Sequence, residues 1–246
     1  MKMEGRRQTA MPDQPPAQHQ DHDKVLIYFA DPMCSWCWGF APVMENLLAE
    51  FPGRFTLRLV MAGLHPAPGR RLSDTDRNAL REHWESVQQQ SGAAFDFRFF
   101  EREHFVYNTE PAARAVIAAR ILDDAAALPM LIALQHAFYA RNHDITRRDT
   151  LLQLAAEQGL GMERFRQTYD SDDCLLELKG HFRAARRVNV EGLPTLYAVD
   201  ANGSVRLTGG YLALPALRKR IDCWLRVPAP DQPARPGLYQ TARQTP

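Results

Sequence analysis

Two cysteines, three positions apart, stand in the stretch Asp31-Pro32-Met33-Cys34-Ser35-Trp36-Cys37-Trp38-Gly39-Phe40-Ala41-Pro42. The run before it, Val25 to Ala30, is short, unbroken and rich in β-branched and aromatic residues, which is typical of a strand buried on both faces. Proline ends that strand, and apolar residues then recur at helical spacing from Val43 until Pro52-Gly53. The cysteines therefore lie at a predicted strand-to-helix junction.

This junction favours redox chemistry at the cysteine pair. A helix N-terminus presents unpaired N–H groups and the positive end of the helix dipole, and both stabilise a thiolate. We expect Cys34 to be the more exposed and more acidic cysteine, and hence the nucleophile. Cys37, one turn further along, can close a disulfide with it and release a mixed-disulfide partner. Pro42 is expected to kink this helix.

The same spacing could instead belong to half of a zinc site. Such a site needs a second pair of ligands, but Cys174 and Cys223 stand alone and no histidine pair has the required spacing. We therefore expect no metal, and no cofactor other than a redox-active disulfide between Cys34 and Cys37. The two lone cysteines are expected to be small buried hydrophobes.

Composition is that of an ordinary soluble globular protein. The chain has 246 residues, of which 45% are hydrophobic and 24% charged, and its net charge is +1. Neither nucleic acid nor a membrane is therefore an expected partner, and no apolar run is long enough to span a bilayer. Residues 1–23 lack the apolar region of a secretory signal and are predicted to be a disordered tail, so a cytoplasmic location is expected.

The remaining pattern predicts a domain with a helical insertion. Residues 55–62 read as a second strand, which completes a βαβ unit with a parallel strand pair. Residues 64–187 are helical throughout, and residues 188–226 return to a strand, a hairpin turn at 200–203, a second strand and a closing helix. We predict a domain formed by 24–63 and 188–226, an insertion domain at 64–187, and a loose C-terminal tail at 227–246.

Within the insertion, several local signals are specific. Ser73 or Asp74 is expected to cap a helix that ends at Ser91-Gly92. The segment from Thr146 to Asp149 resembles a capping box at the start of a later helix. The aromatic residues between 95 and 107 could pack in a core or line a substrate cleft, and a core is the expectation.

The order of these elements, together with Gly-Leu-Pro-Thr at 192–195, resembles the thioredoxin fold with the helical insertion of the DsbA family. The closest resemblance is to its cytoplasmic group of FrnE-like, predicted protein-disulfide isomerases, and it extends over residues 24–226. It implies a cis peptide bond at Pro194 beside the active-site disulfide. It also implies that the Leu193 backbone can pair with an extended substrate. Trp36, Leu193, Pro194 and Thr195 are thus the expected substrate-binding residues.

The sequence departs from that family's pattern in ways that bear on its chemistry. Ser35 and Trp36 stand between the cysteines in place of the Pro-His of the periplasmic oxidant, so a strongly oxidising potential is not implied. Tyr28 stands where many thioredoxin-like proteins have a buried acid. The nearest carboxylate is Asp31, for which proton transfer and capping of the strand-to-helix turn are equally good interpretations.

The function predicted from these observations is thiol–disulfide exchange, as an oxidoreductase or protein-disulfide isomerase. The expected partners are protein or peptide thiols and disulfides, with glutathione or a thioredoxin-type protein for recycling. One alternative is a glutathione-dependent isomerase or transferase of the kappa-class or hydroxychromene-carboxylate isomerase type, against which the intact Cys34–Cys37 pair counts. Another is a non-catalytic peptide-binding chaperone module.

Overall fold

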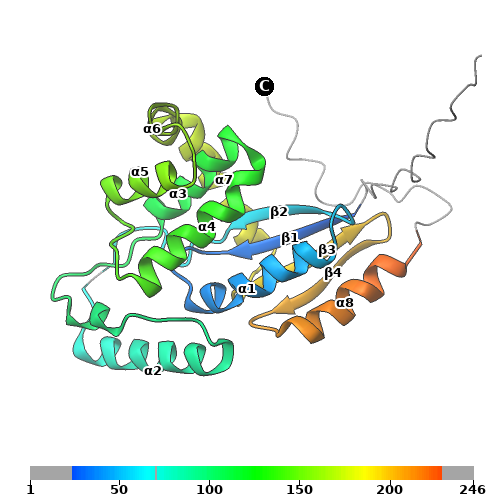
Figure 1. Ribbon diagram of the computed structural model, residues 1–246, viewed down its shortest axis with the longest axis horizontal. Coiled ribbons are helices and arrows are strands. Elements are labelled where there is room, and N and C mark those ends of the chain that lie inside the picture. The colour runs from blue at the N-terminus through cyan, green and yellow to red at the C-terminus, as the bar shows by residue number, and fades with distance from the viewer. Residues whose placement is uncertain (1–23, 70, 229–246) are drawn as a thin grey trace, which may run out of the picture.

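The computed structural model describes residues 24–69 and 71–228, and within them a four-stranded mixed sheet (Figure 1). The predicted tail at 1–23 lies outside the described residues, as does the predicted tail at 227–246 apart from Val227 and Pro228. The strands are β1 (Val25–Ala30), β2 (Thr56–Met61), β3 (Thr195–Asp200) and β4 (Gly203–Gly209).

The sheet has the order β2-β1-β3-β4. β1 pairs in parallel with β2, as the βαβ pattern predicted, and antiparallel with β3. β3 and β4 form the predicted hairpin, whose register shifts at Leu196/Tyr197. β1 is therefore a central strand, and the loop at its carboxyl end is the one that carries the cysteines.

Helices account for the rest of the regular structure in the described residues. The α-helices are α1 (Ser35–Glu50), α2 (Asp74–Ser91), α3 (Glu110–Leu122), α4 (Ala127–Gln135), α5 (Arg148–Glu157), α6 (Met162–Asp170), α7 (Asp172–Arg187) and α8 (Leu214–Arg226). Two 3₁₀ turns, η1 (Phe97–Glu101) and η2 (Asp124–Ala126), and a π-helical turn, η3 (His136–Ala140), complete the set.

Side chains of β1 alternate between the two faces of the sheet and so explain why both faces are covered. Leu26, Tyr28 and Ala30 point into the main core, which α1 and α8 cover. Ile27 and Phe29 point into a smaller cluster on the opposite face, together with Ala185 of α7. The unbroken apolar run of β1 thus reflects burial on both sides.

The helices between β2 and β3 pack around α3, most of whose residues are buried. α2 lies apart from this group in Figure 1 and packs against α1, whereas α7 packs against β2. Trp84 of α2 is fully buried among aromatic rings that include Phe99 and Tyr139, so the aromatic segment contributes to the core as predicted. These contacts join the helices of residues 64–187 to the sheet. That those residues form a separate insertion domain therefore stays a prediction.

One predicted helix start is right and another is wrong. Ser73 caps α2 through a capping box with Asp76, and Gly92 ends the helix in the left-handed conformation. No capping box forms at 146–149: α5 begins at Arg148 without a side-chain cap. There the Asp144 carboxylate accepts both the N–H and the hydroxyl of Thr146, at 3.0 and 2.6 Å. These bonds hold Thr146 in the turn before the helix, and the N-cap position falls on Arg147, which has no hydroxyl or carboxylate to cap with.

Candidate active site

Cys34 and Cys37 lie at the N-terminus of α1, as the sequence predicted. Cys34 is the N-cap residue, and its sulfur accepts the backbone N–H of Cys37 at 3.4 Å. Both residues are thiols in this structure, and Cys34 is 7% exposed whereas Cys37 is fully buried. The N–H group and the N-terminal end of the helix thus face the Cys34 sulfur, which is the more exposed of the two.

The Cys37 thiol is held in its protonated form. Burial raises its pKa well above the usual value, and its hydrogen bond to the Cys34 sulfur and the charge on that sulfur raise it further. The Asp31 carboxylate also raises this pKa, whereas the Asp31 backbone N–H lowers it by donating to the sulfur. Cys37 therefore needs a proton acceptor before it can attack a disulfide.

Asp31 is a fully buried carboxyl group directly beside the cysteine pair. Its two oxygens accept the backbone N–H groups of Met33 at 2.9 Å and Leu64 at 2.7 Å. The Gly63 N–H and the Thr109 hydroxyl also donate to it. Burial outweighs these donors and raises the pKa of Asp31 to about 6. Asp31 thus caps the turn before α1 and, at the same time, titrates near neutral pH.

Tyr28, Gln135 and Thr109 complete a buried polar cluster behind the cysteines. The Tyr28 hydroxyl, at the position where related proteins carry an acid, donates to the Cys37 sulfur. The Gln135 amide donates to the Asp31 carbonyl at 3.2 Å. Sequence reasoning missed Gln135 and Thr109 as site residues, because a polar residue within a helix or at its start carries no signal that its side chain is buried at a distant site.

The predicted cis-proline loop lies on the same cleft as Cys34. The Leu193–Pro194 peptide bond is cis, as the family resemblance implied. The Pro194 carbonyl accepts the N–H of Gly210 at 2.7 Å, and the buried Thr195 hydroxyl donates to the Gly192 carbonyl at 2.6 Å. Thr195 therefore holds the loop in place, and Gly192 and Leu193 are the members of the motif that line the cleft.

This cleft has a volume of about 780 Å³ and is largely walled by apolar and aromatic side chains. Trp36 lies on it together with Cys34, and residues of α2 including Leu80 and His83 form the opposite side. Trp38 points elsewhere, since its indole N–H donates to the Ala94 carbonyl at 2.9 Å. The arrangement brings Cys34, Trp36 and Leu193 together around one space of the size that small ligands and peptide segments occupy.

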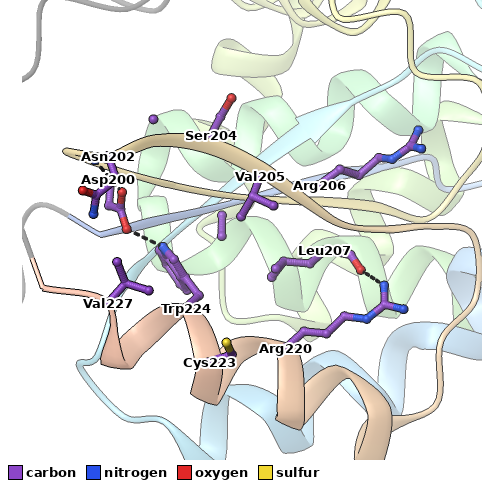
Figure 2. A pocket seen from close by; sticks show the side chains of 12 residues that line it. Asp200, Asn202, Ser204, Val205, Arg206, Leu207, Arg220, Cys223, Trp224 and Val227 are labelled. Atoms are coloured by element: carbon purple, nitrogen blue, oxygen red, sulfur yellow. Dashed lines mark hydrogen bonds between the residues drawn. The ribbon is translucent and has the colours of Figure 1, made fainter.

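The two remaining cysteines lie away from this cleft. Cys174 is fully buried, and its thiol donates to the Arg114 carbonyl at 3.6 Å, as expected of a small core residue. Cys223 is exposed, so the same expectation is wrong for it. It lies at a separate pocket of about 440 Å³ between β4 and α8, beside Trp224 and Arg220 (Figure 2). Its sulfur lies at the open pocket rather than in the core, which explains its exposure.

Neither a metal-binding cluster nor a membrane-spanning helix is found in the described part of the chain. No group of three or more His, Cys, Asp or Glu residues there is placed to hold a metal ion. None of the helices described is long and apolar enough to cross a membrane.

Solved structures resemble this chain closely in fold. A "putative protein disulfide isomerase" from Nitrosomonas europaea is 34% identical with a TM-score of 0.77, over 83% of this chain and 98% of that one. The "cytosolic disulfide reductase DsbM" from Pseudomonas aeruginosa is 27% identical with a TM-score of 0.68, over 82% of this chain and 98% of that one. DsbM has also been solved with GSH.

Relatives found by sequence are named as adapter proteins, not as disulfide isomerases or reductases. The "ClpXP adapter protein SpxH" of Bacillus subtilis (strain 168) is 27% identical over 179 residues, which are 72% of this chain. The match spans 59% of the SpxH chain.

A protein-family model matches most of the chain. The model described as thioredoxin matches residues 28–209, which include the cysteine pair, the helical region and the cis-proline loop. This chain therefore belongs to the thioredoxin family, and its fold is that of the DsbA-like disulfide oxidoreductases.

Proposed function

We propose that this chain is a thiol–disulfide oxidoreductase in which Cys34 is the nucleophile and Cys37 the resolving cysteine. One observation carries the proposal: Cys34 caps α1, its sulfur accepts the Cys37 N–H at 3.4 Å, and Cys37 is buried directly behind it. This geometry activates one sulfur and protects the other from external disulfides.

The reaction follows from these positions. The Cys34 thiolate attacks a substrate disulfide, so that a Cys34–substrate S–S bond forms and the other substrate sulfur leaves as a thiolate. Cys37 then loses its proton and attacks the Cys34 sulfur, which forms the Cys34–Cys37 disulfide and releases the second substrate thiolate. The substrate gains two electrons from the dithiol, and a thiol reductant must return them. Run in reverse, the same steps donate a disulfide.

We assign the proton released by Cys37 to Asp31. Its carboxyl group is fully buried, its pKa is raised by burial to about 6, and its charge acts on the Cys37 thiol. A base whose pKa lies near the working pH is suited to accept such a proton. Asp31 also caps the turn before α1. It therefore has two roles: it holds this loop in place and it accepts the proton.

Glutathione is the proposed recycling partner, with a thioredoxin-type protein as the other reductant of the same chemistry. Support comes from the related DsbM of Pseudomonas aeruginosa, whose structure has been solved with GSH and which is described as cytosolic. We propose the same compartment for this chain, where a reducing thiol pool favours the reductase or isomerase direction.

Trapping and alkylation test the proposed mechanism. The reduced protein is equilibrated with oxidised and reduced glutathione, quenched with an alkylating agent and mapped by mass spectrometry. We expect a Cys34–Cys37 disulfide in the wild type, a stable mixed disulfide on Cys34 in Cys37→Ser, and no disulfide on Cys37 in Cys34→Ser. Cys223→Ser, which alters an exposed cysteine of the second pocket, is the matched control and should behave as wild type. Failure to form the Cys34–Cys37 disulfide at every glutathione ratio would refute the redox function.

A second candidate is adapter-type protein binding without catalysis. The observation in its favour is the 27% identity to SpxH, which is named an adapter for ClpXP. The two candidates differ in their need for the nucleophile. Under the adapter hypothesis, Cys34→Ser retains the cellular function and the bound partner. Under the redox hypothesis, the substitution abolishes the function.

A further inference from the structure

β4 is an edge strand with backbone groups that face away from the sheet. The described sheet has the order β2-β1-β3-β4, so β4 pairs on one side only, with β3. Asp200 and Gly203 flank the two-residue turn and form its first pair, which in a hairpin of this length is hydrogen-bonded. Because bonded and non-bonded pairs alternate, Ser204 and Arg206 direct their N–H and C=O groups to the open edge. No other element of the described residues donates to these groups or accepts from them.

The two faces of this edge differ in character. Val205 pairs with Ala198, whose side chain lies in the main core on the face that α1 and α8 cover. Arg206 pairs with Tyr197, which packs in the smaller cluster on the opposite face. Since cross-strand partners share a face, Val205 faces α8 and Arg206 extends away from it (Figure 2). An apolar and a basic side chain thus stand on opposite faces of one open edge.

An apolar groove lies between this edge and α8. The pocket of about 440 Å³ has Val205 on the strand side and Cys223 and Val227 on the helix side (Figure 2). Val205 and Val227 are 52% and 42% exposed, although both are large apolar side chains. Arg220 lies at one end of the groove, where its guanidinium donates to the Leu207 carbonyl. The groove therefore offers uncovered apolar contacts directly beside the open backbone of β4.

The charge along this edge is positive. No ion pair of Arg206 is found among the described residues, and Arg220 bonds to a neutral carbonyl. Asp200 is the acidic residue of the groove, and it lies 3.7 Å from the Lys24 ammonium and accepts the Trp224 indole N–H at 2.8 Å. The charge of Asp200 is thus balanced within the protein. The two arginines remain, and they favour an acidic partner.

We propose that the β4 edge binds an extended polypeptide segment of a partner protein, in which apolar residues alternate with acidic ones. The backbone of the segment pairs with Ser204 and Arg206. Its apolar side chains enter the groove beside Val205, and its acidic side chains meet Arg206 on the other face. Among the described residues, this groove shares no lining residue with the cleft of Cys34. The proposal is therefore independent of the redox function.

Binding of synthetic peptides to the reduced full-length protein tests this proposal. A fluorescein-labelled peptide with the core Val-Glu-Val-Glu-Val is titrated by fluorescence anisotropy, alongside Val-Lys-Val-Lys-Val and Ser-Glu-Ser-Glu-Ser. We expect saturable binding of the first peptide and a Kd about tenfold higher, or more, for each of the others. The bound peptide should also slow hydrogen exchange of the Ser204 and Arg206 amides and alkylation of Cys223.

Two matched pairs of substitutions separate the backbone contact from the charge. Ser204→Pro removes an outward N–H, and proline is tolerated where an edge strand faces solvent. We expect it to raise the Kd about three- to tenfold, as for one hydrogen bond, whereas Ser204→Ala keeps the N–H and should bind as the wild type. Arg206→Gln should raise the Kd about twofold or more at low salt. Arg58→Gln, an exposed residue of the opposite edge strand β2, should not change it.

Three results would overturn the proposal. The first is the lack of saturable binding of Val-Glu-Val-Glu-Val. The second is equal binding by folded Ser204→Pro and Ser204→Ala; if the proline variant does not fold, a peptide N-methylated at its central residue replaces it, since it lacks a backbone donor. The third is slow hydrogen exchange at Ser204 and Arg206 in the protein without peptide, which would mean that a second copy or residues 229–246 occupy the edge.

Discussion

At the scale of single residues, Asp31 reduces the stability of the fold in a pH-dependent way. Its pKa of about 6 lies above the usual 3.8, so the folded state binds a proton more tightly than the unfolded state does. Between these two values the folded state holds more protons, and stability therefore falls as pH rises from about 4 to 6. Above pH 6 the full penalty is present, with an upper bound of about 3 kcal/mol.

Asp31→Asn should remove that pH dependence. We expect the variant to be less stable than the wild type by about 1 kcal/mol near pH 4, because one hydrogen bond is lost, and more stable by about 1–2 kcal/mol at pH 7, where the wild type carries the charge penalty. Urea unfolding of the reduced proteins at several pH values measures this difference. The opposite result would be a wild-type stability that rises between pH 4 and 6, relative to Asp31→Asn. It would contradict the conclusion that burial raises the pKa of Asp31.

The same residue marks the limit of what sequence could predict about the site. The cysteine pair and the loop around Pro194 follow from motifs, because their chemistry depends on local spacing. Whether Asp31 caps a turn or titrates depended on burial, and the structure gives it both properties. Gln135 joins it from a helix far along the chain, which no local pattern indicates.

At the scale of elements, the contact between α1 and α2 depends on Gly39. A Cβ at Gly39 would meet the Ser91 side chain at 2.7 and 2.9 Å and Val87 at 3.0 Å, so Gly39→Ala should force the helices apart. We expect a loss of about 1–3 kcal/mol, typical of overpacking. Gly180→Ala in α7, where only the end of Arg183 lies near at 3.9 Å, should instead gain about 0.5–1 kcal/mol from helix propensity. Chemical denaturation of both variants checks the pair, and equal effects would contradict the close approach at Gly39.

The end of α8 is attached to the start of β1 by a buried lysine. Lys24 is 6% exposed, donates to the carbonyls of Trp224 and Val227 at 3.2 and 3.0 Å, and lies 3.7 Å from the Asp200 carboxylate. Lys24→Met should cost about 3–5 kcal/mol, because it leaves a nearly buried carboxylate without its cation. Lys219→Met, an exposed lysine of the same helix, should change the free energy of unfolding by less than about 0.5 kcal/mol. Similar losses in the two variants would refute this role.

Helices and strands could largely be predicted, because their periodicity and their capping residues depend on neighbouring positions in the sequence. The Ser73 cap and the Gly92 stop of α2 are examples. The π-helical turn at His136–Ala140 and the false capping box at 146–149 could not be predicted correctly, since both depend on which of several nearby groups a side chain or carbonyl bonds. The placement of α2 against Cys34 was also missed, because it results from packing between helices distant in sequence.

At the scale of the whole molecule, the site combines the sheet with the helical region. β1 and α1 supply the cysteines and Asp31, the segment before β3 supplies the cis-proline loop, and α2, Thr109 and Gln135 come from the residues between β2 and β3. The helical region therefore sets both access to Cys34 and the electrostatics behind Cys37. This dependence explains why the cysteine motif alone leaves the direction of the reaction open.

The reduction potential is the property in which these contributions combine. The buried Asp31 carboxylate disfavours a thiolate on Cys37, and burial also keeps that thiol protonated, so the Cys37 sulfur lends no thiolate stabilisation to the reduced pair. We expect a potential nearer the thioredoxin value of about −270 mV than the DsbA value of about −120 mV, measured against glutathione by alkylation and tryptophan fluorescence. Asp31→Asn removes the buried charge and should raise the potential by about 30 mV, equivalent to about 1.4 kcal/mol. Glu85→Gln, which removes an exposed charge from α2, should leave it unchanged. A wild-type potential near the DsbA value would show that the charge of Asp31 does not determine the potential of the Cys34–Cys37 pair. It would also favour disulfide donation as the direction of the reaction.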